Sequence, residues 1–219
     1  MSSPTKFQNR SEAGQLLGER LGYLTPERPI VLGLPRGGVP VAFEVAQALA
    51  SPLDVLVVRK LGVPFHPELA FGAIGEDDAQ VLNTQLVQQL GLSKDTIAEV
   101  ARHEHAELIR RVELYRGDRA ALALTGRTVV IVDDGLATGA TARVAVEVAR
   151  ARGAKRIIVA VPVSPREAVA ELRTLADEVI SLYVPTRFEA VGQWYEDFNQ
   201  TTDDEVTSLL RNPSNTDPL

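Results

Sequence analysis

The sequence contains no cysteine. Without thiols it has neither disulfides nor thiolate metal sites, which fits a reducing compartment such as the cytoplasm. It also has no apolar run of about eighteen residues, the length that a membrane-spanning helix needs. The first residues, Met1 to Glu12, lack the apolar segment of a secretory signal. We therefore expect a cytoplasmic protein that does not contact a membrane.

Basic residues are scarcer than acidic ones, at 23 against 29, and none of them form a lysine- or arginine-rich run. A nucleic-acid backbone is bound by a basic face, so nucleic acid is not an expected partner. The 219 residues, 45% of them hydrophobic, suffice for one domain with a proper core. With no repeat or linker visible, we expect a single domain over 1–210 with its core at about 30–184, and a disordered tail at 211–219.

Segments of strand and helix character alternate along the chain with short connections. The expected strands are 30–34, 54–58, 128–132, 156–161 and 178–184, and the expected helices are 11–24, 39–50, 93–116, about 142–152 and 164–175. We expect Ser11, Ser93 and Ser164 to cap helices, and residues 1–10 to be loosely held. This alternation predicts an α/β fold with a doubly wound, mainly parallel sheet.

One region departs from this alternation. Residues 61–83 are punctuated by glycine and proline, and within them Ala70–Ile74 can pair with Gln80–Leu82 as a hairpin. We expect a flexible loop and hairpin here. Its carboxylates are not assigned a role: Glu68, Glu76, Asp77 and Asp78.

The stretch 128–141 carries the strongest chemical signal. An apolar strand, Thr128–Val132, is followed by Asp133 and Asp134, then by small and hydroxyl residues that lead into a helix. The unpaired N–H groups of a helix N-terminus favour an anion, most readily a phosphate. The pattern therefore indicates a cradle for a sugar phosphate. A structural ion pair and a phospho-acceptor receiver are the alternatives for the two acids.

The stretch Val129–Thr141 resembles the phosphoribosyl diphosphate (PRPP) motif of the type I phosphoribosyltransferases. It has four apolar residues, two acids, two mostly apolar residues, and then a small residue followed by Thr-Gly-x-Thr; Gly135 is the one departure, since a branched residue is usual there. The resemblance implies an enzyme that transfers ribose 5-phosphate from Mg²⁺-bound PRPP to a nitrogen acceptor and releases pyrophosphate. It also identifies the helix at 93–116 as an insertion that either covers the site or forms a homodimer contact.

The resemblance also implies roles for individual residues. Asp133 and Asp134 would bind the ribose hydroxyls and Mg²⁺, directly or through water. The 5′-phosphate would lie in the loop made by Ala137, Thr138, Gly139, Ala140 and Thr141. The pyrophosphate would be bound by a loop whose non-prolyl peptide bond is often cis in the family, and by basic residues at the root of the flexible loop: Arg36, Gly37, Gly38, Arg59 and Lys60. With the two acids, Arg36 and Lys60 form the expected catalytic set; simple solvation is the alternative for the basic pair.

The acceptor is defined less sharply. Residues 185–210 resemble the small C-terminal hood of purine enzymes, in which Arg187, Phe188 and Trp194 would bind a nucleobase or a related amine; packing is the alternative for the aromatics. Hypoxanthine- and guanine-specific enzymes carry an aspartate where this chain has Ala137, so those specificities are disfavoured. The resemblance implies nucleotide metabolism and salvage.

Two other interpretations stay open. A regulatory protein would keep the fold and bind PRPP or a nucleotide with little catalysis, although Arg36 and Lys60 favour the enzyme. A fragment of a PRPP synthetase is the third interpretation, against which stand the short chain and the absence of a repeat.

Overall fold

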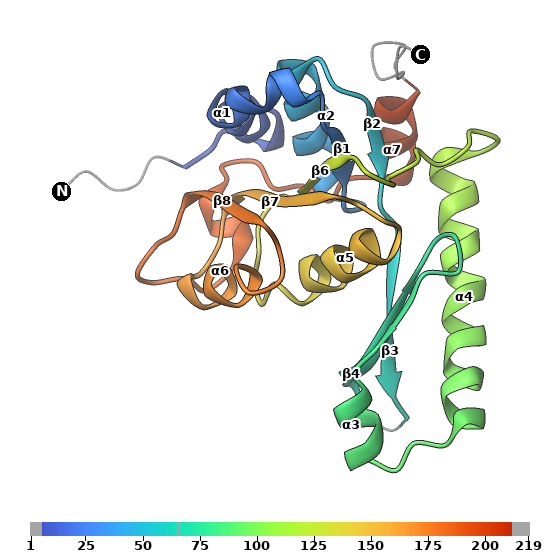
Figure 1. Ribbon diagram of the computed structural model, residues 1–219. Helices are drawn as coiled ribbons and strands as arrows, with labels where there is room; N and C mark the ends of the chain where they lie inside the picture. The colour runs from blue at the N-terminus through green and yellow to red at the C-terminus, as the bar shows by residue number, and fades with distance from the viewer. Residues whose placement is uncertain (1–5, 65, 212–219) are drawn as a thin grey trace.

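The computed structural model describes residues 6–64 and 66–211, with only the backbone described at Pro67 and Glu68. Its main sheet has five strands in the order β2-β1-β6-β7-β8, and every neighbouring pair is parallel (Figure 1). The strands are β1 (Ile30–Gly33), β2 (Leu53–Val55), β6 (Thr128–Val132), β7 (Arg156–Val163) and β8 (Glu178–Tyr183). The predicted mainly parallel α/β fold is confirmed.

Side chains of the central strands alternate between two apolar cores. Val31 and Val130 face one core, whereas Ile30 and Ile131 face the other. Helices α1 (Arg10–Leu21) and α2 (Gly38–Leu49) cover the first face, and α5 (Ala140–Ala151) and α6 (Arg166–Leu172) cover the second (Figure 1). The sheet is therefore buried on both faces, as a doubly wound fold requires.

The strand order reverses direction between β1 and β6. From β1 the chain moves outward to β2, and after a long excursion it returns to the other side of β1 as β6. In open parallel sheets, ligands bind outside the carboxyl ends of the strands at such a switch point. The loops that follow β1 and β6 are therefore the expected location of a ligand-binding site.

The long excursion begins with a separate antiparallel sheet made of β3 (Val58–Val63), β4 (His66–Gly75) and β5 (Gln80–Leu82). The predicted hairpin is confirmed, with Gly72 opposite Leu82. The strand predicted at 54–58 is confirmed as β2, but it ends at Val55, because the chain from Val58 onward pairs with β4 instead of β1. A short helix that we did not predict follows, α3 (Thr84–Gln89).

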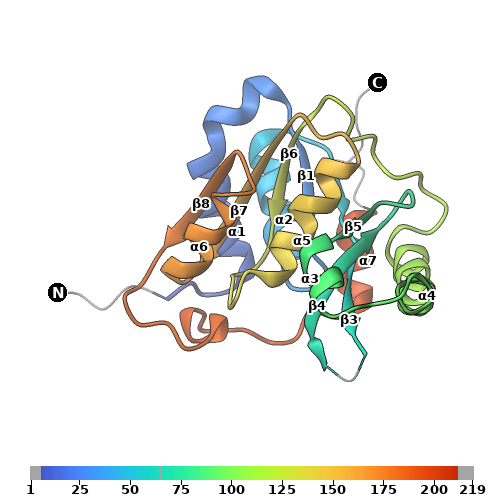
Figure 2. The same cartoon turned by 60° about the horizontal axis from the view of Figure 1, so that its bottom comes forward.

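The predicted long helix is confirmed as α4 (Lys94–Arg116), with Ser93 Oγ accepting the N–H of Thr96 at 3.1 Å. It runs alongside β3 and β4, so that the small sheet and α4 project together from the main sheet (Figures 1 and 2). In the part of the chain that the structure describes, no helix is long and apolar enough to cross a membrane.

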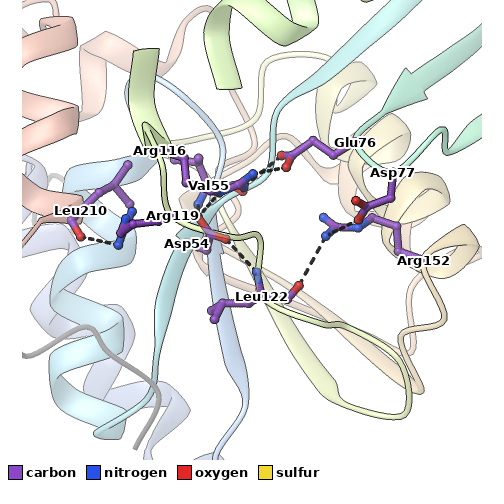
Figure 3. Close-up of polar contacts among 9 residues, drawn as sticks. All are labelled: Asp54, Val55, Glu76, Asp77, Arg116, Arg119, Leu122, Arg152 and Leu210. Carbon is purple, nitrogen blue, oxygen red and sulfur yellow. Dashed lines mark hydrogen bonds and ion pairs between the residues drawn. The ribbon is translucent and has the colours of Figure 1, made fainter. Parts of the chain in front are cut away.

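A buried cluster of charges joins this projection to the main sheet (Figure 3). Arg116, at the end of α4, donates to Asp54 Oδ1 of β2 at 3.1 Å and to Glu76 Oε1 after β4 at 3.1 Å. These side chains are only 3%, 6% and 6% exposed. The Leu122 N–H donates to Asp54 Oδ2 at 3.2 Å. One arginine thus connects the small sheet, the long helix and the edge strand of the main sheet.

The N-terminal segment corrects two expectations. Helix α1 begins at Arg10 and is capped by Asn9, whose Oδ1 accepts the Glu12 N–H at 3.0 Å, so Ser11 is not the cap. Residues 6–10 are not loose, because Phe7 is buried and its N–H donates to the Trp194 carbonyl at 2.9 Å. Residues 1–5 lie outside the described part. After α1 comes a 3₁₀ segment, η1 (Gly22–Glu27).

The C-terminal part also differs from expectation. The N-cap position of α6 is Pro165, one residue after the predicted Ser164, and it makes no side-chain hydrogen bond to the helix. The segment expected as the hood has two parts: 185–202, which contains η2 (Val191–Trp194), and α7 (Asp203–Leu210), which packs against α2 and α4. Arg211 donates its N–H to the Thr207 carbonyl at 3.1 Å, contrary to the expected disorder there; the rest of the expected tail, 212–219, lies outside the described residues.

Candidate active site

The loops after β1 and β6 pack directly against each other at the switch point. The Leu34 N–H donates to the Val132 carbonyl at 2.9 Å. A Cβ atom on Gly38 would lie 2.6 Å from that same carbonyl oxygen, and one on Gly37 would clash with Asp134 Oδ2. The Pro35–Arg36 peptide bond is cis, as the resemblance implies for this loop. Glycine is therefore needed for the loop to lie against the two acids.

The first turn of α5 forms the second wall of the site. Gly139 caps the helix with φ 74° and without a side-chain hydrogen bond. Ala137, Thr138 and Thr141 are exposed around it, and Thr138 Oγ1 accepts the Ala140 N–H at 3.4 Å. The N–H groups of a first turn have no partner within their helix. The turn is therefore open to an anion, with two hydroxyl groups beside it.

The two acids lie between these loops and differ in their contacts. Asp133 Oδ1 accepts the Asp134 N–H at 2.9 Å. Burial raises the pKa of Asp133 well above its ordinary value, and the charge of Asp134 raises it further. Burial also raises the pKa of Asp134, while the nearby Arg10 guanidinium opposes that rise. The pair is therefore a place where a cation or hydroxyl donors would be stabilised.

Arg10 is a residue of this site that sequence reasoning missed. Its Nε and Nη2 atoms contact Asp134 Oδ2 at 2.9 and 2.8 Å, and Nη1 donates to the Asn199 carbonyl at 2.7 Å. Its guanidinium carbon lies 4.0 Å from the ring centroid of Phe198. Nothing local in the sequence indicates this contact, because Arg10 and Asp134 are 124 positions apart.

The predicted pyrophosphate residues occupy different settings. Among the described residues, the ion-pair partner of Arg36, beside Gly37, is Asp203 at a loose 3.8 Å, and both side chains are substantially exposed. Arg59 lies in β3 and is ion-paired with Glu104 of α4 at 2.6 Å. Lys60 is exposed on the same strand. Arg36 is thus available to a ligand at the switch point, whereas Arg59 must exchange its partner to reach one.

The predicted acceptor residues lie in segment 185–202. Arg187 and Trp194 line a cavity of about 370 Å³ together with Tyr183, Val184, Pro185 and Thr186. Within the described chain, Trp194 Nε1 is buried with no hydrogen-bond partner. Phe188 is half-buried and packs in an aromatic cluster, whose buried members are Phe7, Trp194 and Tyr195 and whose partly buried members include Tyr183 and Phe198. The Tyr195 hydroxyl donates to the Asp134 carbonyl at 2.6 Å, so this segment is linked to the acid pair.

The departure at Gly135 has a steric explanation. A Cβ atom at this position would lie 2.5 Å from Val191 and 3.1 Å from Val163. The valine of the 185–202 segment thus fills the space that a branched side chain would take in the usual motif. The motif and the segment that covers it are matched in shape.

Gly135→Ala is expected to destabilise the protein by about 1–3 kcal/mol, because the added methyl overpacks the contact with Val191. Urea unfolding measures the change. Gly22→Ala is the matched control, since a Cβ atom at Gly22 meets nothing within 4 Å. Adding Val191→Ala to Gly135→Ala should recover stability; an equal or larger loss in the double variant would contradict the steric explanation.

A parallel α/β sheet with an acid pair, an open helix N-terminus and a glycine loop at its switch point is the arrangement of a phosphoribosyltransferase. Residues 9–198 match the phosphoribosyl transferase domain family, and the chain belongs to it.

The names of two curated relatives agree with this membership, and one solved structure shares the fold. The chain is 55% identical over 204 residues to proteins of two Mycobacterium tuberculosis strains, one of them named "Putative phosphoribosyl transferase Rv0571c". The match covers 93% of this chain but 46% of those proteins, so the chain spans about half the length of the curated relatives it matches. The crystal structure of TT1426 from Thermus thermophilus is 45% identical, with a TM-score of 0.87 over 94% of this chain and 98% of that one.

Proposed function

We propose that this phosphoribosyltransferase is PRPP-dependent and transfers ribose 5-phosphate to a nitrogen acceptor with release of pyrophosphate. The observation that carries the proposal is the direct packing of the glycine loop against Asp133 and Asp134 beside the open first turn of α5. A glycine loop and a helix N-terminus on either side of two acids suit a substrate with a phosphate at each end and hydroxyls between them.

Each wall would bind one part of PRPP. The 5′-phosphate would accept hydrogen bonds from the first-turn N–H groups and from Thr138 and Thr141, each worth roughly 1.5–3 kcal/mol when the acceptor is charged. Asp133 and Asp134 would accept from the ribose hydroxyls. The pyrophosphate would lie against Gly37 and Gly38, with cationic side chains from the predicted set: Arg36, Arg59 and Lys60.

Asp133 and Asp134 suit a Mg²⁺ ion that binds together with PRPP. No group of three or more potential metal-ligating side chains is found among the described residues. Mg²⁺ is often held by one or two carboxylates together with water and substrate phosphates, which Asp133 and Asp134 can provide. When bound, the metal would offset the negative charge of the diphosphate.

In the reaction, the bond from the ribose C1 atom to the diphosphate oxygen breaks and a nitrogen lone pair forms the new bond. The diphosphate keeps the bonding electrons, and the acceptor nitrogen loses its proton. Arg36 would stabilise charge on the leaving group, and the 185–202 segment would keep water from the electron-poor carbon. The protein thus acts mainly through positioning and electrostatics.

The acceptor would be a nucleobase or a related amine, bound by Arg187, Phe188 and Trp194. Support comes from the cavity of about 370 Å³ that Arg187 and Trp194 line together. Stacking of a base on an aromatic side chain is worth roughly 1–3 kcal/mol.

The test is pyrophosphate release from PRPP and Mg²⁺ against a panel of nucleobases and small amines. Release that depends on one acceptor would support the proposal and identify that acceptor. Binding of PRPP without release for any acceptor would favour a regulatory PRPP-binding protein. Absence of PRPP binding would contradict both.

Lys60→Ala is expected to lower kcat about 10- to 100-fold with little change in the KM for PRPP, if its ammonium group meets the pyrophosphate mainly as charge develops. Steady-state kinetics with the acceptor found above measures both constants. Lys94→Ala is the control, because Lys94 is an exposed lysine at the start of α4. Equal losses in kcat and in PRPP affinity would make Lys60 a ground-state anchor instead.

A further inference from the structure

We infer that Arg10 is a positioning residue for the acid pair: it fixes Asp134 in one orientation and supplies the positive charge that lets an anionic substrate bind beside it. The inference rests on the proposed function and adds a residue from the N-terminal helix to the site.

The contact is a specific one and not a loose surface ion pair. The Arg10 and Asp134 side chains are only 12% and 14% exposed. The three guanidinium nitrogens of Arg10 are all engaged, two with Asp134 Oδ2 and one with the Asn199 carbonyl. The flat face lies on Phe198, 4.0 Å from its ring centroid. A planar, charged guanidinium group can make these four contacts at once, whereas the ammonium group of a lysine cannot.

This geometry makes the two acids unequal. Both short contacts fall on Asp134 Oδ2, so Oδ1 is the oxygen of Asp134 left for a ligand. Asp133 has no ion-pair partner in the described part of the chain, and its Oδ1 accepts the Asp134 N–H. Asp133 therefore offers the main carboxylate for a ribose hydroxyl, and Asp134 offers a single, fixed oxygen.

The charge of Arg10 matters as much as its geometry. Without it, two adjacent carboxylates would face a substrate that carries several negative charges. Asp134 Oδ2 lies close to Gly37, and without Arg10 nothing would compensate its charge beside the glycine loop. Loss of Arg10 should therefore weaken PRPP binding more than it slows the chemical step.

Arg10 also connects the two halves of the site. Phe198 and Asn199 belong to the segment that covers the acceptor side, and the Tyr195 hydroxyl in that segment holds the Asp134 carbonyl. The Phe7 carbonyl accepts the Glu196 N–H at 2.8 Å, so the chain before Arg10 is paired with the same segment. Asp134 is thus held through its side chain by Arg10 and through its carbonyl by Tyr195, the neighbour of Trp194, which lines the proposed acceptor cavity.

The experiment compares Arg10→Ala and Arg10→Lys with the wild-type protein and with Arg20→Ala, an exposed arginine of the same helix. Mg²⁺-PRPP binding is measured by isothermal titration calorimetry, KM and kcat by pyrophosphate release, and folding by circular dichroism. Arg10→Ala is expected to weaken PRPP binding and raise its KM about 10- to 100-fold, with kcat within about threefold. Arg10→Lys, which keeps the charge, should lie between Arg10→Ala and wild type, and Arg20→Ala should equal wild type.

Wild-type affinity for PRPP in a folded Arg10→Ala protein would overturn the inference, as would a lower melting temperature with unchanged KM, which marks a merely structural contact. If Arg10→Ala does not fold, wild-type KM in Arg10→Lys with its single nitrogen would overturn the fixed-orientation argument, and a raised KM would support it. Failure of the wild-type protein to bind PRPP would instead reject the proposed function.

Discussion

Asp133→Asn is expected to lower kcat/KM for PRPP about 100-fold and, at the same time, to raise the melting temperature. Asparagine keeps the oxygen that accepts the Asp134 N–H, so the local fold is preserved. It loses the charge that would bind a ribose hydroxyl, and a hydrogen bond to a charged group is worth roughly 1.5–3 kcal/mol. Stability rises because keeping this partly buried acid ionised costs the native protein free energy.

The gain in stability should depend on pH in a defined direction. Since burial and the Asp134 charge raise the pKa of Asp133 above its value in the unfolded chain, ionisation is easier after unfolding. Wild-type stability is therefore lost as pH rises through the raised pKa, and the penalty is absent below the unfolded value of about 3.9. The melting temperature of Asp133→Asn should exceed that of wild type most at neutral pH, and the difference should shrink toward about pH 4.

Thermal melts without Mg²⁺, followed by circular dichroism across this pH range, provide the measurement. Asp134→Asn is the informative comparison, because it also leaves Arg10 without its ion-pair partner and should gain less stability or lose some. The double variant Asp133→Asn with Asp134→Asn should abolish PRPP turnover. Unchanged turnover in a folded double variant would remove the acid pair from the site.

Arg116→Ala is expected to destabilise the protein by about 3–5 kcal/mol, the usual cost of breaking a buried ion pair. The substitution would leave Asp54 and Glu76 charged, buried and without their partner (Figure 3). It would also release the Val55 carbonyl, to which Arg116 Nη2 donates at 3.1 Å. Urea unfolding monitored by circular dichroism measures the loss.

Two further variants separate burial from charge in that cluster. Arg110→Ala removes an ion pair with Glu107 on the same helix, but the Arg110 side chain is 61% exposed, so solvent screens the pair and we expect little or no measurable loss. Arg116→Ala with Glu76→Ala removes both partners and should cost less than the sum of the single changes, by about 1–3 kcal/mol. Simple additivity, or equal effects at Arg110 and Arg116, would contradict the importance of the buried cluster.

Short-range patterns account for the features that the sequence predicted well. The apolar run at 128–132, the Ser93 cap and the hairpin around 75–78 each depend on neighbours within a few residues. The strand and helix alternation predicted the parallel sheet for the same reason. Element ends were predicted less well: Asn9 caps α1 in place of Ser11, and Pro165 occupies the N-cap position of α6 in place of Ser164.

Long-range contacts account for what was missed. Val58 to Val63 was not predicted as a separate strand. Its local sequence does not show that it pairs with β4 and not with the main sheet. Gly135 departs from the usual motif because Val191 packs there. Glu76 has the sequence context of an exposed loop acid, and only its contact with Arg116 in the folded protein buries it.

The sequence by itself determined which chemical groups lie at the switch point. The acids, glycines and hydroxyl residues directly follow parallel strands, and therefore lie together at the carboxyl edge of the sheet. Only the tertiary structure decided how those groups are held: Arg10 on Asp134, Val191 over Gly135, and Arg116 between Asp54 and Glu76. The physical reason is that charge compensation and steric fit depend on distances of a few ångströms. Such distances are set by packing between segments that are distant in the chain, on which local propensity has no bearing.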